Sequence, residues 1–272
     1  MKRMAAPLPD LDALRPALAR PFGLFSDVDG TLAPIAPRPE DARIPAAIVA
    51  LLGGLLRSGA LVAFLSGRRA TELQRLVGLE GAVYVGNHGL ETWERGRLRM
   101  APGLRRYRRL ARAARAELER LPVPGLLLED KEVGLAVHYR LSPLPEAARL
   151  AVLDAIAASP ACRSFWVLEG KMVVELRPPL GLDKGTAALD LARRHRLRGV
   201  LALGDDATDA AMFRRLRGAR GLTAICIAVA GPETPRLVLE LAHYAVEGVP
   251  GVERLLQGLL RAFAPGTPPI GP

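Results

Sequence analysis

Two carboxylates stand one residue apart where a predicted strand ends. The apolar run at residues 22–26 is followed by Asp27, Val28, Asp29 and Gly30, and this change from apolar residues to a glycine indicates the end of the strand. Because strand side chains alternate, Asp27 and Asp29 share a side and repel one another unless a cation or a shared proton intervenes. A hard metal ion with oxygen ligands meets that need. The alternative is an acidic turn without a metal, since Asp and Gly are common turn residues.

Other residues suited to the same chemistry also stand at the boundaries of predicted elements. Ser66 follows a second apolar run, Asp205 and Asp209 follow a third, and Lys184 begins a predicted helix. In an open parallel sheet, ligands bind at the carboxyl ends of the strands, so these residues are expected to meet at one site. Each also has a structural explanation. Ser66 could cap a helix, Lys184 could be a solvated first-turn residue, and Asp205 with Asp206 could cap the helix that follows.

Together these residue types supply what phosphoryl transfer needs, which is a nucleophile, in-line geometry and compensation of negative charge. Asp27 is the candidate nucleophile that would form an aspartyl-phosphate, and Asp29 is the candidate general acid and base. Mg2+ would be held by Asp27, Asp205 and the backbone carbonyl of Asp29. Ser66 and Lys184 would contact the remaining phosphate oxygens.

The elements that must position these residues follow an α/β pattern. Apolar strands alternate with amphipathic helices, which predicts βαβ units in a parallel sheet flanked by helices. A short helix is expected before the first strand, at 8–20, and a proline-rich loop follows that strand. The expected elements after the loop are a helix at 44–57, a strand at 61–65, a helix at 70–77, a strand at 82–85, a helix at 183–195, a strand at 200–203, a helix through Phe213 and a strand at 223–228.

The alternation is interrupted between residues 101 and 178. This segment combines a strongly basic amphipathic helix at 104–121 and a second helix at 145–158 with strands that can pair as hairpins, an α+β arrangement. We therefore expect an inserted domain at 101–178 within a core formed by residues 1–100 and 179–264. A disordered tail rich in Pro and Gly is expected at 265–272.

Composition narrows the functional class. The formal net charge of +10 suggests a phosphate-bearing partner, with nucleic acid the first to consider, yet the excess is arginine dispersed along the helices, with only four lysines in the chain. No uncharged apolar run approaches the roughly 20 residues that span a bilayer, and prolines and charges interrupt the N-terminal leucines. A cytoplasmic protein with neither a nucleic-acid nor a membrane partner is expected. Cys162 and Cys226 lack metal-ligand spacing.

Four regions resemble the motifs of the haloacid dehalogenase (HAD) superfamily of phosphatases: DVDGT at 27–31, Ser66, Lys184 and GDDATD at 204–209. Further segments are similar to those of the trehalose-6-phosphate phosphatase family. These are SGR at 66–68, GNHGLE at 86–91, EDKEVGLAVHYR at 129–140 and GKMVVELRPPLGLDKG at 170–185. The superfamily motifs indicate the chemistry without the substrate, whereas the segments inside the insertion point to trehalose.

The resemblance implies a HAD-like Rossmannoid core with an inserted α+β cap of type C2. It also implies hydrolysis of trehalose 6-phosphate to trehalose and phosphate through a phospho-aspartyl intermediate, in trehalose biosynthesis. Asp27 would be the nucleophile, Asp29 the acid and base, and Asp27, Asp29 and Asp205 the metal ligands, with Asp206 and Asp209 supporting them. The expected substrate-binding residues are Arg68, Asn87, His88, Glu129, Lys131, Arg140 and Glu175. One departure from the family pattern is Ala210, where the family usually has an acid.

Several alternatives stay open. Another capped sugar-phosphate phosphatase, acting for example on sucrose phosphate or mannosyl-phosphoglycerate, would use the same core, and a non-catalytic, basic nucleic-acid-binding protein is a remote alternative. Lys171 competes with Lys184 for the phosphate role, and Lys184 is preferred because Gly185 lets a helix begin close to an anion. Glu175 could simply neutralise Arg177. The chain is expected to be a monomer, with association with trehalose-6-phosphate synthase as a further possibility.

One alternative concerns the segment HYR. His138, Tyr139 and Arg140 alternate along a predicted strand, so at least one of them is expected to face a core or to pair across the sheet.

Overall fold

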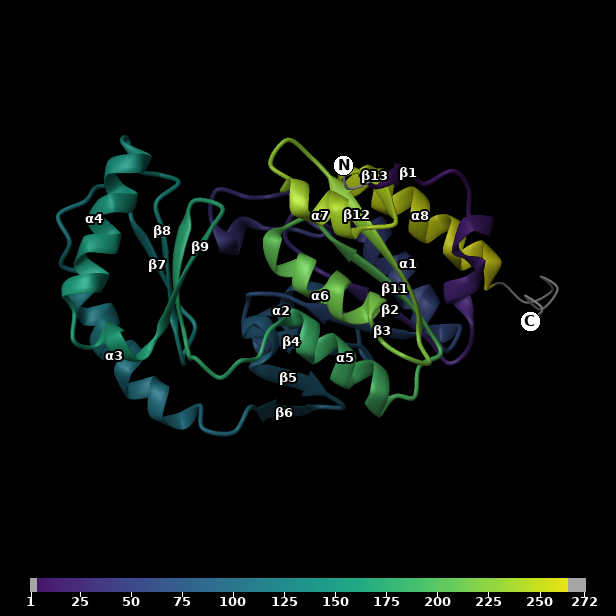
Figure 1. The fold of residues 1–272 in the computed structure, drawn as a ribbon, viewed down its shortest axis with the longest axis horizontal. Helices are drawn as coiled ribbons and strands as arrows, with labels where there is room; N and C mark the ends of the chain where they lie inside the picture. Colours follow the sequence, from purple (N-terminus) through teal and green to yellow (C-terminus); the bar gives the residue numbers. More distant parts are fainter. Residues whose placement is uncertain (1–3, 264–272) are drawn as a thin grey trace. The chain divides into compact units, whose positions relative to one another are not determined.

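The computed structural model describes residues 4–263, so the predicted tail at 265–272 lies outside the described residues. The chain divides into two compact units (Figure 1). The smaller unit is Met100–Gly181, and the larger unit contains the described residues up to Arg99 and from Leu182 onward. These limits lie within three residues of the insertion expected at 101–178, whose role as a cap stays a prediction.

A nine-stranded sheet forms the centre of the larger unit. Its strands are ordered β1-β13-β12-β11-β2-β3-β4-β5-β6. Neighbours from β1 to β4 pair in parallel, and β4 pairs with β5 antiparallel. The predicted α/β fold with a mainly parallel sheet is therefore confirmed. The strands are β1 (Ala6–Pro7), β2 (Phe22–Ser26), β3 (Leu61–Leu65), β4 (Val83–Gly86), β5 (Glu91–Glu94), β6 (Arg97–Met100), β11 (Gly199–Gly204), β12 (Thr223–Ala230) and β13 (Tyr244–Glu247).

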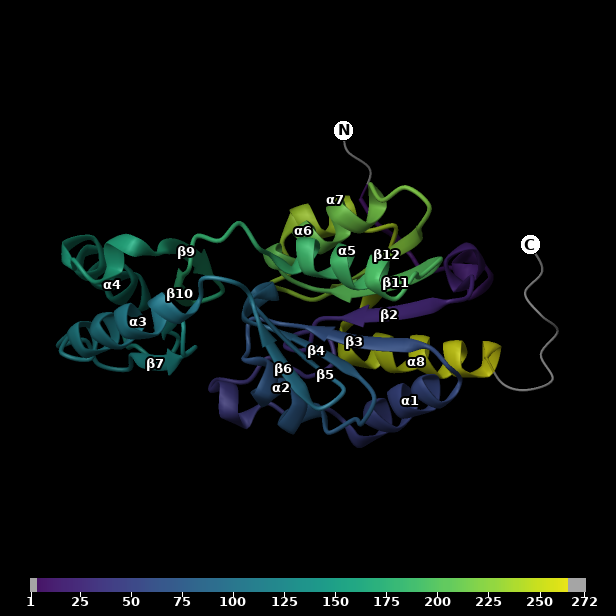
Figure 2. The ribbon, with the colours of Figure 1, turned by 90° about the horizontal axis from the view of Figure 1, so that it is seen from below.

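Helices cover both faces of this sheet (Figure 2). One face carries α1 (Ala46–Arg57), α2 (Ala70–Val77) and α8 (Gly248–Ala262), and the other carries α5 (Lys184–Arg194), α6 (Ala207–Arg217) and α7 (Arg236–Leu241). Phe64 packs in the apolar core of the first face, and Phe25 packs in that of the second. Both faces of the central strands are thus apolar, which explains why these strands appear in the sequence as continuous apolar runs.

The central strands align the predicted site residues along one edge of the sheet. β2 lies between β11 and β3 and pairs with both in parallel register. Asp27 follows β2, Ser66 follows β3 and Asp205 follows β11. Because the carboxyl ends of parallel strands meet at one edge, the three residues stand beside one another there.

Several elements of the larger unit were not predicted from the sequence. β5 and β6 form a hairpin whose turn residues, Arg95 and Gly96, both have positive φ, which suits a tight two-residue turn. β1, β13, α7 and α8 were also missed, because β1 is only two residues long and α8 carries Pro250 in its first turn. The helix expected at 8–20 is a 3-10 helix, η1 (Asp12–Leu18), which contains Pro16.

Among the helices of residues 4–263, none combines the length and the apolar character that crossing a membrane requires.

The smaller unit has the expected α+β arrangement. Its four-stranded antiparallel sheet has the order β7-β8-β10-β9, with hairpin pairing of β7 with β8 and of β9 with β10. Two helices, α3 (Arg105–Leu118) and α4 (Pro145–Ala158), pack against β8 and β10 respectively. The strands are β7 (Leu127–Asp130), β8 (Leu135–His138), β9 (Trp166–Gly170) and β10 (Val173–Arg177).

The strand register of the smaller unit separates an apolar face from a polar one. Val174 and Leu176 on β10 are buried, and they alternate with half-buried Glu175 and Arg177. The buried residues face the helices, because α3 and α4 pack on this sheet. The register places six residues on the opposite side, which we call the polar face: Glu129, Ala136, Glu175 and Leu168 in one cross-strand row, and Arg177 opposite Trp166 beside it.

Gly185 allows two helices that carry site residues to pack closely. A Cβ atom at Gly185 on α5 would lie 2.4 Å from the carbonyl oxygen of Ala211 on α6. The structure therefore gives this glycine a packing role that the sequence did not indicate. Lys184 begins α5 and Asp209 lies in the first turn of α6, so the close approach of the two helices also brings these two site residues near one another.

We expect Gly185→Ala to lower the free energy of unfolding by about 1–3 kcal/mol, because the new methyl group must push two backbones apart. Urea unfolding followed by circular dichroism measures this change. Gly53→Ala on α1 is the matched control, since its Cβ would meet nothing nearer than 3.4 Å and helix propensity favours alanine by about 0.5–1 kcal/mol. Equal effects of the two substitutions would contradict the packing role.

Candidate functional site

Lys184 is a buried ammonium held by two carboxylates. Its Nζ donates to Asp27 Oδ1 at 2.8 Å and to Asp209 Oδ1 at 2.9 Å. The three side chains are at most 5% exposed, which excludes the alternative of a solvated first-turn lysine. A third carboxylate oxygen, Asp206 Oδ1, lies 4.0 Å from Nζ. The ammonium therefore links the end of β2 to the start of α6.

Two capping boxes determine where the helices of the site begin. Asp183 accepts from the backbone N–H of Thr186 at 2.6 Å, and Thr186 Oγ1 accepts from the N–H of Asp183, which makes Lys184 the first residue of α5. Asp206 caps α6 in the same way, with Asp209 as its reciprocal partner. The capping explanation is thus confirmed for Asp206, whose supporting role at a metal site stays a prediction.

Burial and mutual repulsion shift the ionisation of the carboxylates. Burial raises the pKa of Asp27 well above its usual range, against the opposing charge of Lys184, and the neighbouring acids raise it further. Burial likewise raises the pKa of Asp209 to about 7. Although burial disfavours its charge, Lys184 has a raised pKa because Asp209 and Asp27 stabilise the ammonium. One ammonium therefore faces more negative charge than it can neutralise.

Three carboxylates of this cluster could hold a cation. Asp27, Asp205 and Asp209 each offer an oxygen within 4.8 Å of the others. These all-oxygen donors suit a hard divalent ion, which would also supply the missing positive charge. Gly30 and Gly204 make room for two of them, since a Cβ atom at Gly30 would lie 2.4 Å from Asp205 Oδ2 and one at Gly204 would lie 2.3 Å from Asp209 Cγ.

Asp209 is already committed to other partners. Its Oδ2 accepts from the backbone N–H groups of Asp205 and Asp206, both at 3.0 Å, while its Oδ1 accepts from Lys184. Asp205 is oriented instead by Thr31, whose hydroxyl donates to its Oδ1 at 3.1 Å. Cation binding by Asp27 and Asp205, with Asp209 as a supporting residue, stays a prediction with which these contacts agree. The role of Thr31 was missed, although it stands inside the DVDGT motif.

Arg68 binds Asp29 in a two-pronged ion pair. Its Nε and Nη2 donate to the two carboxylate oxygens at 2.6 and 2.7 Å, and Nη2 also donates to the carbonyl oxygen of Pro39 at 2.8 Å. Such planar pairing fixes orientation as well as distance. The carboxylate of Asp29 is thus engaged outside the cluster of Asp27, Asp205 and Asp209, while ligation through its backbone carbonyl and substrate contact by Arg68 stay predictions.

Ser66 lies at the end of β3, 2% exposed. Its Oγ accepts from the N–H of Arg68 at 3.2 Å, whereas the N-cap of α2 is Arg69, so the helix-cap explanation of Ser66 is wrong. Its backbone carbonyl accepts from the N–H of His88 at 2.9 Å, and Asn87 donates to the carbonyl of Arg68. The structure thus brings Ser66 together with the predicted residues Arg68, Asn87 and His88.

Glu91 holds that turn and was missed by the sequence analysis. Its Oε1 accepts from Asn87 Nδ2 at 2.7 Å, and its Oε2 accepts from the N–H of Ala70 at the start of α2 at 3.0 Å. It is 2% exposed, and a carboxylate at a helix N-terminus is electrostatically favoured. Asn87 and His88 adopt positive φ of 48° and 55°. The last letter of the segment GNHGLE was the signal that could have identified it.

The carboxylate of Glu129, in the smaller unit, contacts the side chains of Lys131 and His138. Lys131 Nζ donates to its Oε1, and His138 Nε2 lies 2.8 Å from its Oε2. Burial alone would raise the pKa of Glu129, but the charge of Lys131 and the hydrogen bond with His138 lower it to about 2. The predicted pair of Glu129 and Lys131 is therefore in contact, and His138 joins it.

The other two predicted substrate-binding residues of the smaller unit are Glu175, which lies in the same row as Glu129, and Arg140, which lies farther along the sheet. Glu175 shares its cross-strand row with Glu129 and accepts from Arg177 Nη2 at 3.0 Å, so the expected neutralising contact is present. Arg140 Nη2 contacts the carbonyl of Lys171 at 3.4 Å, beyond the end of β8. At about 3.3 Å per residue, Arg140 stands about 13 Å along the strand from the row of Glu129.

Two further expectations concern buried residues. Tyr139 is 5% exposed, as expected for one of the three residues of the HYR segment. Ala210, which stands where the family usually has an acid, packs in the apolar core around α5 and α6.

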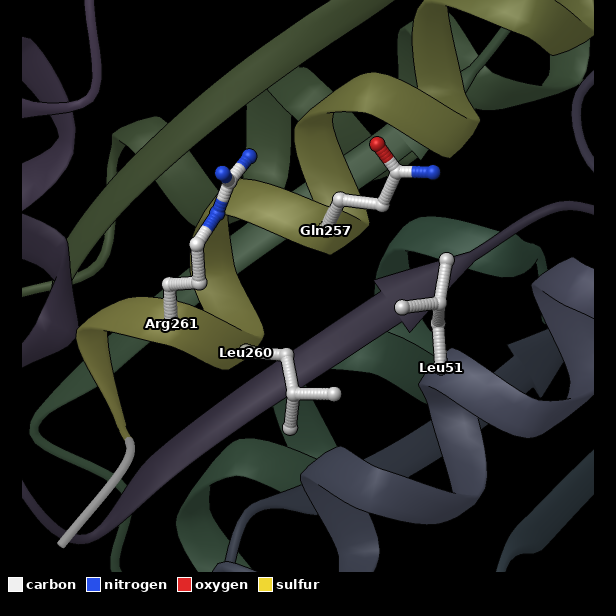
Figure 3. Close-up of a pocket in the computed structure, with 4 residues that line it drawn as sticks. All are labelled: Leu51, Gln257, Leu260 and Arg261. Atoms are coloured by element: carbon white, nitrogen blue, oxygen red, sulfur yellow. The ribbon is translucent and has the colours of Figure 1, made fainter.

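A separate depression of about 400 Å3 lies between α1 and α8 (Figure 3). Its lining residues are Leu51, Gln257, Leu260 and Arg261. None of the four is an acid or a nucleophile, so this depression offers no group that could carry out phosphoryl transfer.

We expect Glu129→Gln to destabilise the protein near pH 7 but not in strong acid. Because folding lowers the pKa of Glu129 to about 2, the carboxylate stabilises the fold above its unfolded pKa of about 4.3, and that contribution is lost as pH falls toward the folded value. Urea midpoints of wild type and variant should therefore draw together progressively as the pH falls from about 5 to below about 2, the range this shift implies. Glu169→Gln is the control, since it removes an exposed ion pair with Arg149 from the same sheet. A constant difference at every pH would contradict the prediction.

Comparison with known sequences supports the same chemistry. The trehalose-phosphatase family model matches residues 25–233. A probable trehalose-phosphate phosphatase of Sinorhizobium fredii is 32% identical over 249 residues, covering 89% of this chain and 88% of that protein. The trehalose-phosphate phosphatase of Mycobacterium marinum is 34% identical over 223 residues, covering 74% of this chain and 55% of that protein. The chain thus spans about half the length of the mycobacterial relative.

Solved structures share the fold. The C-terminal domain of Candida albicans trehalose-6-phosphate phosphatase has a TM-score of 0.76 at 22% identity, covering 97% of this chain and all of that one. A sugar phosphatase of HAD subclass IIB has a TM-score of 0.55 at 16% identity, covering 87% of this chain and 98% of that one. The family match over most of the chain, together with the carboxylates and lysine that the structure assembles, leads to one conclusion: the chain belongs to the trehalose-phosphatase family.

Proposed function

We propose that this protein hydrolyses trehalose 6-phosphate to trehalose and inorganic phosphate, as a step of trehalose biosynthesis. The observation that carries the proposal is the buried contact of Lys184 with Asp27 at the carboxyl end of the sheet, 2.8 Å long, in a member of this family. The names of the relatives support the substrate, and the oxygen-rich cluster supports the reaction class.

The reaction would proceed in two steps, formation of an aspartyl-phosphate on Asp27 and its hydrolysis by water. A carboxylate oxygen of Asp27 attacks phosphorus, the bond between phosphorus and the sugar oxygen breaks, and the leaving oxygen takes a proton from Asp29. A water oxygen then attacks the same phosphorus, Asp29 takes a proton from that water, and the bond between phosphorus and Asp27 breaks. Phosphate leaves and both carboxyl groups return to their starting states.

Asp27, Asp205 and the backbone carbonyl of Asp29 would hold Mg2+, which when bound offsets the negative charge shared by the nucleophile and the phosphate. Lys184 adds a fixed positive charge beside Asp27. Ser66, one residue beyond the neighbouring strand, would donate its hydroxyl to a phosphate oxygen. Lys184 is preferred to Lys171 for the phosphate, because Lys184 contacts the candidate nucleophile Asp27 at 2.8 Å.

Recognition of the sugar is assigned to residues of the smaller unit, acting as a cap. Glu129, Lys131 and Glu175 would bind sugar hydroxyls, because their ionised groups can make several strong hydrogen bonds. Their placement on one side of a single sheet supports a shared ligand. Arg68, Asn87, His88 and Arg140 stay predicted substrate contacts, of which Arg68 is bound to Asp29 in this structure.

Other assignments stay predictions as well. Sucrose phosphate and mannosyl-phosphoglycerate are the alternative substrates, and the monomeric state, the cytoplasmic location and association with trehalose-6-phosphate synthase await measurement. Nucleic-acid binding, suggested only by the net charge of +10, would appear as a steeply salt-dependent mobility shift.

We expect trehalose 6-phosphate to be hydrolysed at least about tenfold more efficiently than glucose 6-phosphate, sucrose phosphate or mannosyl-phosphoglycerate.

Asp27→Asn should lower kcat at least about a thousandfold on every one of these substrates, since it removes the nucleophile. Phosphate release from this panel measures both effects. Asp190→Asn, an exposed change on α5, is the control and should stay fully active. Preference for another sugar phosphate would refute the substrate, and an active Asp27→Asn would refute the mechanism.

Removal of divalent metal should stop hydrolysis, because Asp27, Asp205 and Asp209 would then meet the substrate phosphate with only Lys184 to offset their charge. Dialysis against EDTA followed by addition of Mg2+ tests this expectation, with phosphate release as the measurement. Recovery with Mg2+ and not with Na+ at equal ionic strength would support the site. Undiminished turnover after complete chelation would show that the cluster binds no catalytic metal.

A further inference from the structure

We propose that Trp166 forms an aromatic platform for a glucose ring on the polar face of the smaller unit, and is thereby a specificity-determining residue for a disaccharide phosphate. This inference rests on the proposed function, which it extends from the polar residues of the face to its edge. It concerns only the smaller unit, whose sheet carries every residue involved.

The position of Trp166 follows from the strand register. Trp166 is the first residue of β9 and pairs directly opposite Arg177 of β10. Directly opposed side chains of an antiparallel pair share a face, and diagonal neighbours lie about 7–8 Å apart, within reach of an aromatic ring. Glu175 is such a diagonal neighbour, because it pairs with Leu168, two residues after Trp166. Trp166 therefore borders the row that contains Glu175 and Glu129.

The exposure of Trp166 is unusual for so large an apolar side chain. It is 48% exposed, and β9 is an edge strand, so no further strand of the sheet covers the ring. Val167, the next residue, is also exposed, but alternation directs it toward the face that carries the helices. Trp166 is thus an exposed aromatic on a face where its cross-strand neighbours are charged, Arg177 directly opposite and Glu175 on the diagonal.

This combination suits a sugar ring. A glucose ring presents flat faces of C–H groups and a rim of hydroxyls, so it is recognised by an aromatic surface together with a few well-placed polar groups. Trp166 supplies the aromatic surface, and Glu175 supplies a carboxylate held in place by Arg177 at 3.0 Å. Glu129 and Lys131 continue the polar row on β7 and in the turn that follows it.

The first test separates binding from chemistry. Trp166→Ala should raise KM for trehalose 6-phosphate about tenfold, the scale of a lost aromatic contact, with kcat nearly unchanged. Trp166→Phe should retain most of the affinity, and kcat/KM for p-nitrophenyl phosphate, which has no sugar ring, should be unchanged in both. The exposure of the side chain allows Trp166→Ala to fold, which circular dichroism checks. An unaltered KM, or equal losses on both substrates, would overturn the platform.

The second test reads the ring directly. Trp93, the other tryptophan of the chain, lies on β5 and packs against the core of the larger unit, so Trp93→Phe leaves Trp166 as the sole tryptophan. Trehalose should shift the emission of that variant to shorter wavelength and saturate, whereas glucose should act more weakly. The matched control, Trp166→Phe, should not respond.

The two tests also distinguish failure of the platform from failure of the proposed function. Wild-type protein inactive on trehalose 6-phosphate would refute the proposed function. An active wild type whose Trp166 emission ignores trehalose, at concentrations where trehalose inhibits hydrolysis, would refute only the platform.

Discussion

The larger unit depends on one buried ammonium. Lys184 is 2% exposed and lies between Asp27 and Asp209, with Asp206 at 4.0 Å. Burying these charges is unfavourable unless they stay paired, and removal of one partner from such a pair typically costs about 3–5 kcal/mol. The contact therefore has to be maintained by the strand, the two helices and the caps that place these residues.

Close backbone approach makes this charge cluster possible. Gly30 and Gly204 leave space for the carboxylates of Asp205 and Asp209, and Gly185 lets α5 and α6 meet. The backbone N–H groups of Asp205 and Asp206 then satisfy Asp209. Asp27 and Asp205 lie in the same buried cluster, where a bound cation would offset the charge of these carboxylates and of a substrate phosphate together.

The two units combine different kinds of chemistry. The larger unit gathers acids and one lysine for a phosphoryl group, which every sugar phosphate shares. The smaller unit offers the polar face, where Glu129, Lys131 and Glu175 stand on one side of a sheet. Its ionic contacts, such as that of Glu129 with Lys131 and His138, hold these charged groups in fixed orientations. Under the proposed function, catalysis and sugar selectivity would therefore be separable by independent mutation of the two units.

The sequence by itself determined the α/β class, the insertion and most central elements, since β3 and α2 begin and end at the predicted residues and these depend on local periodicity. It also singled out Asp27, Ser66 and Asp205 as candidates, because polar residues after apolar runs are a local signal, and Lys184 as the first residue of a predicted helix. Only the tertiary structure decided their partners. Asp27 and Lys184 are 157 residues apart, and the pairing of Arg68 with Asp29, or the shared face of Glu129 and Glu175, depends on register and packing that no local pattern encodes.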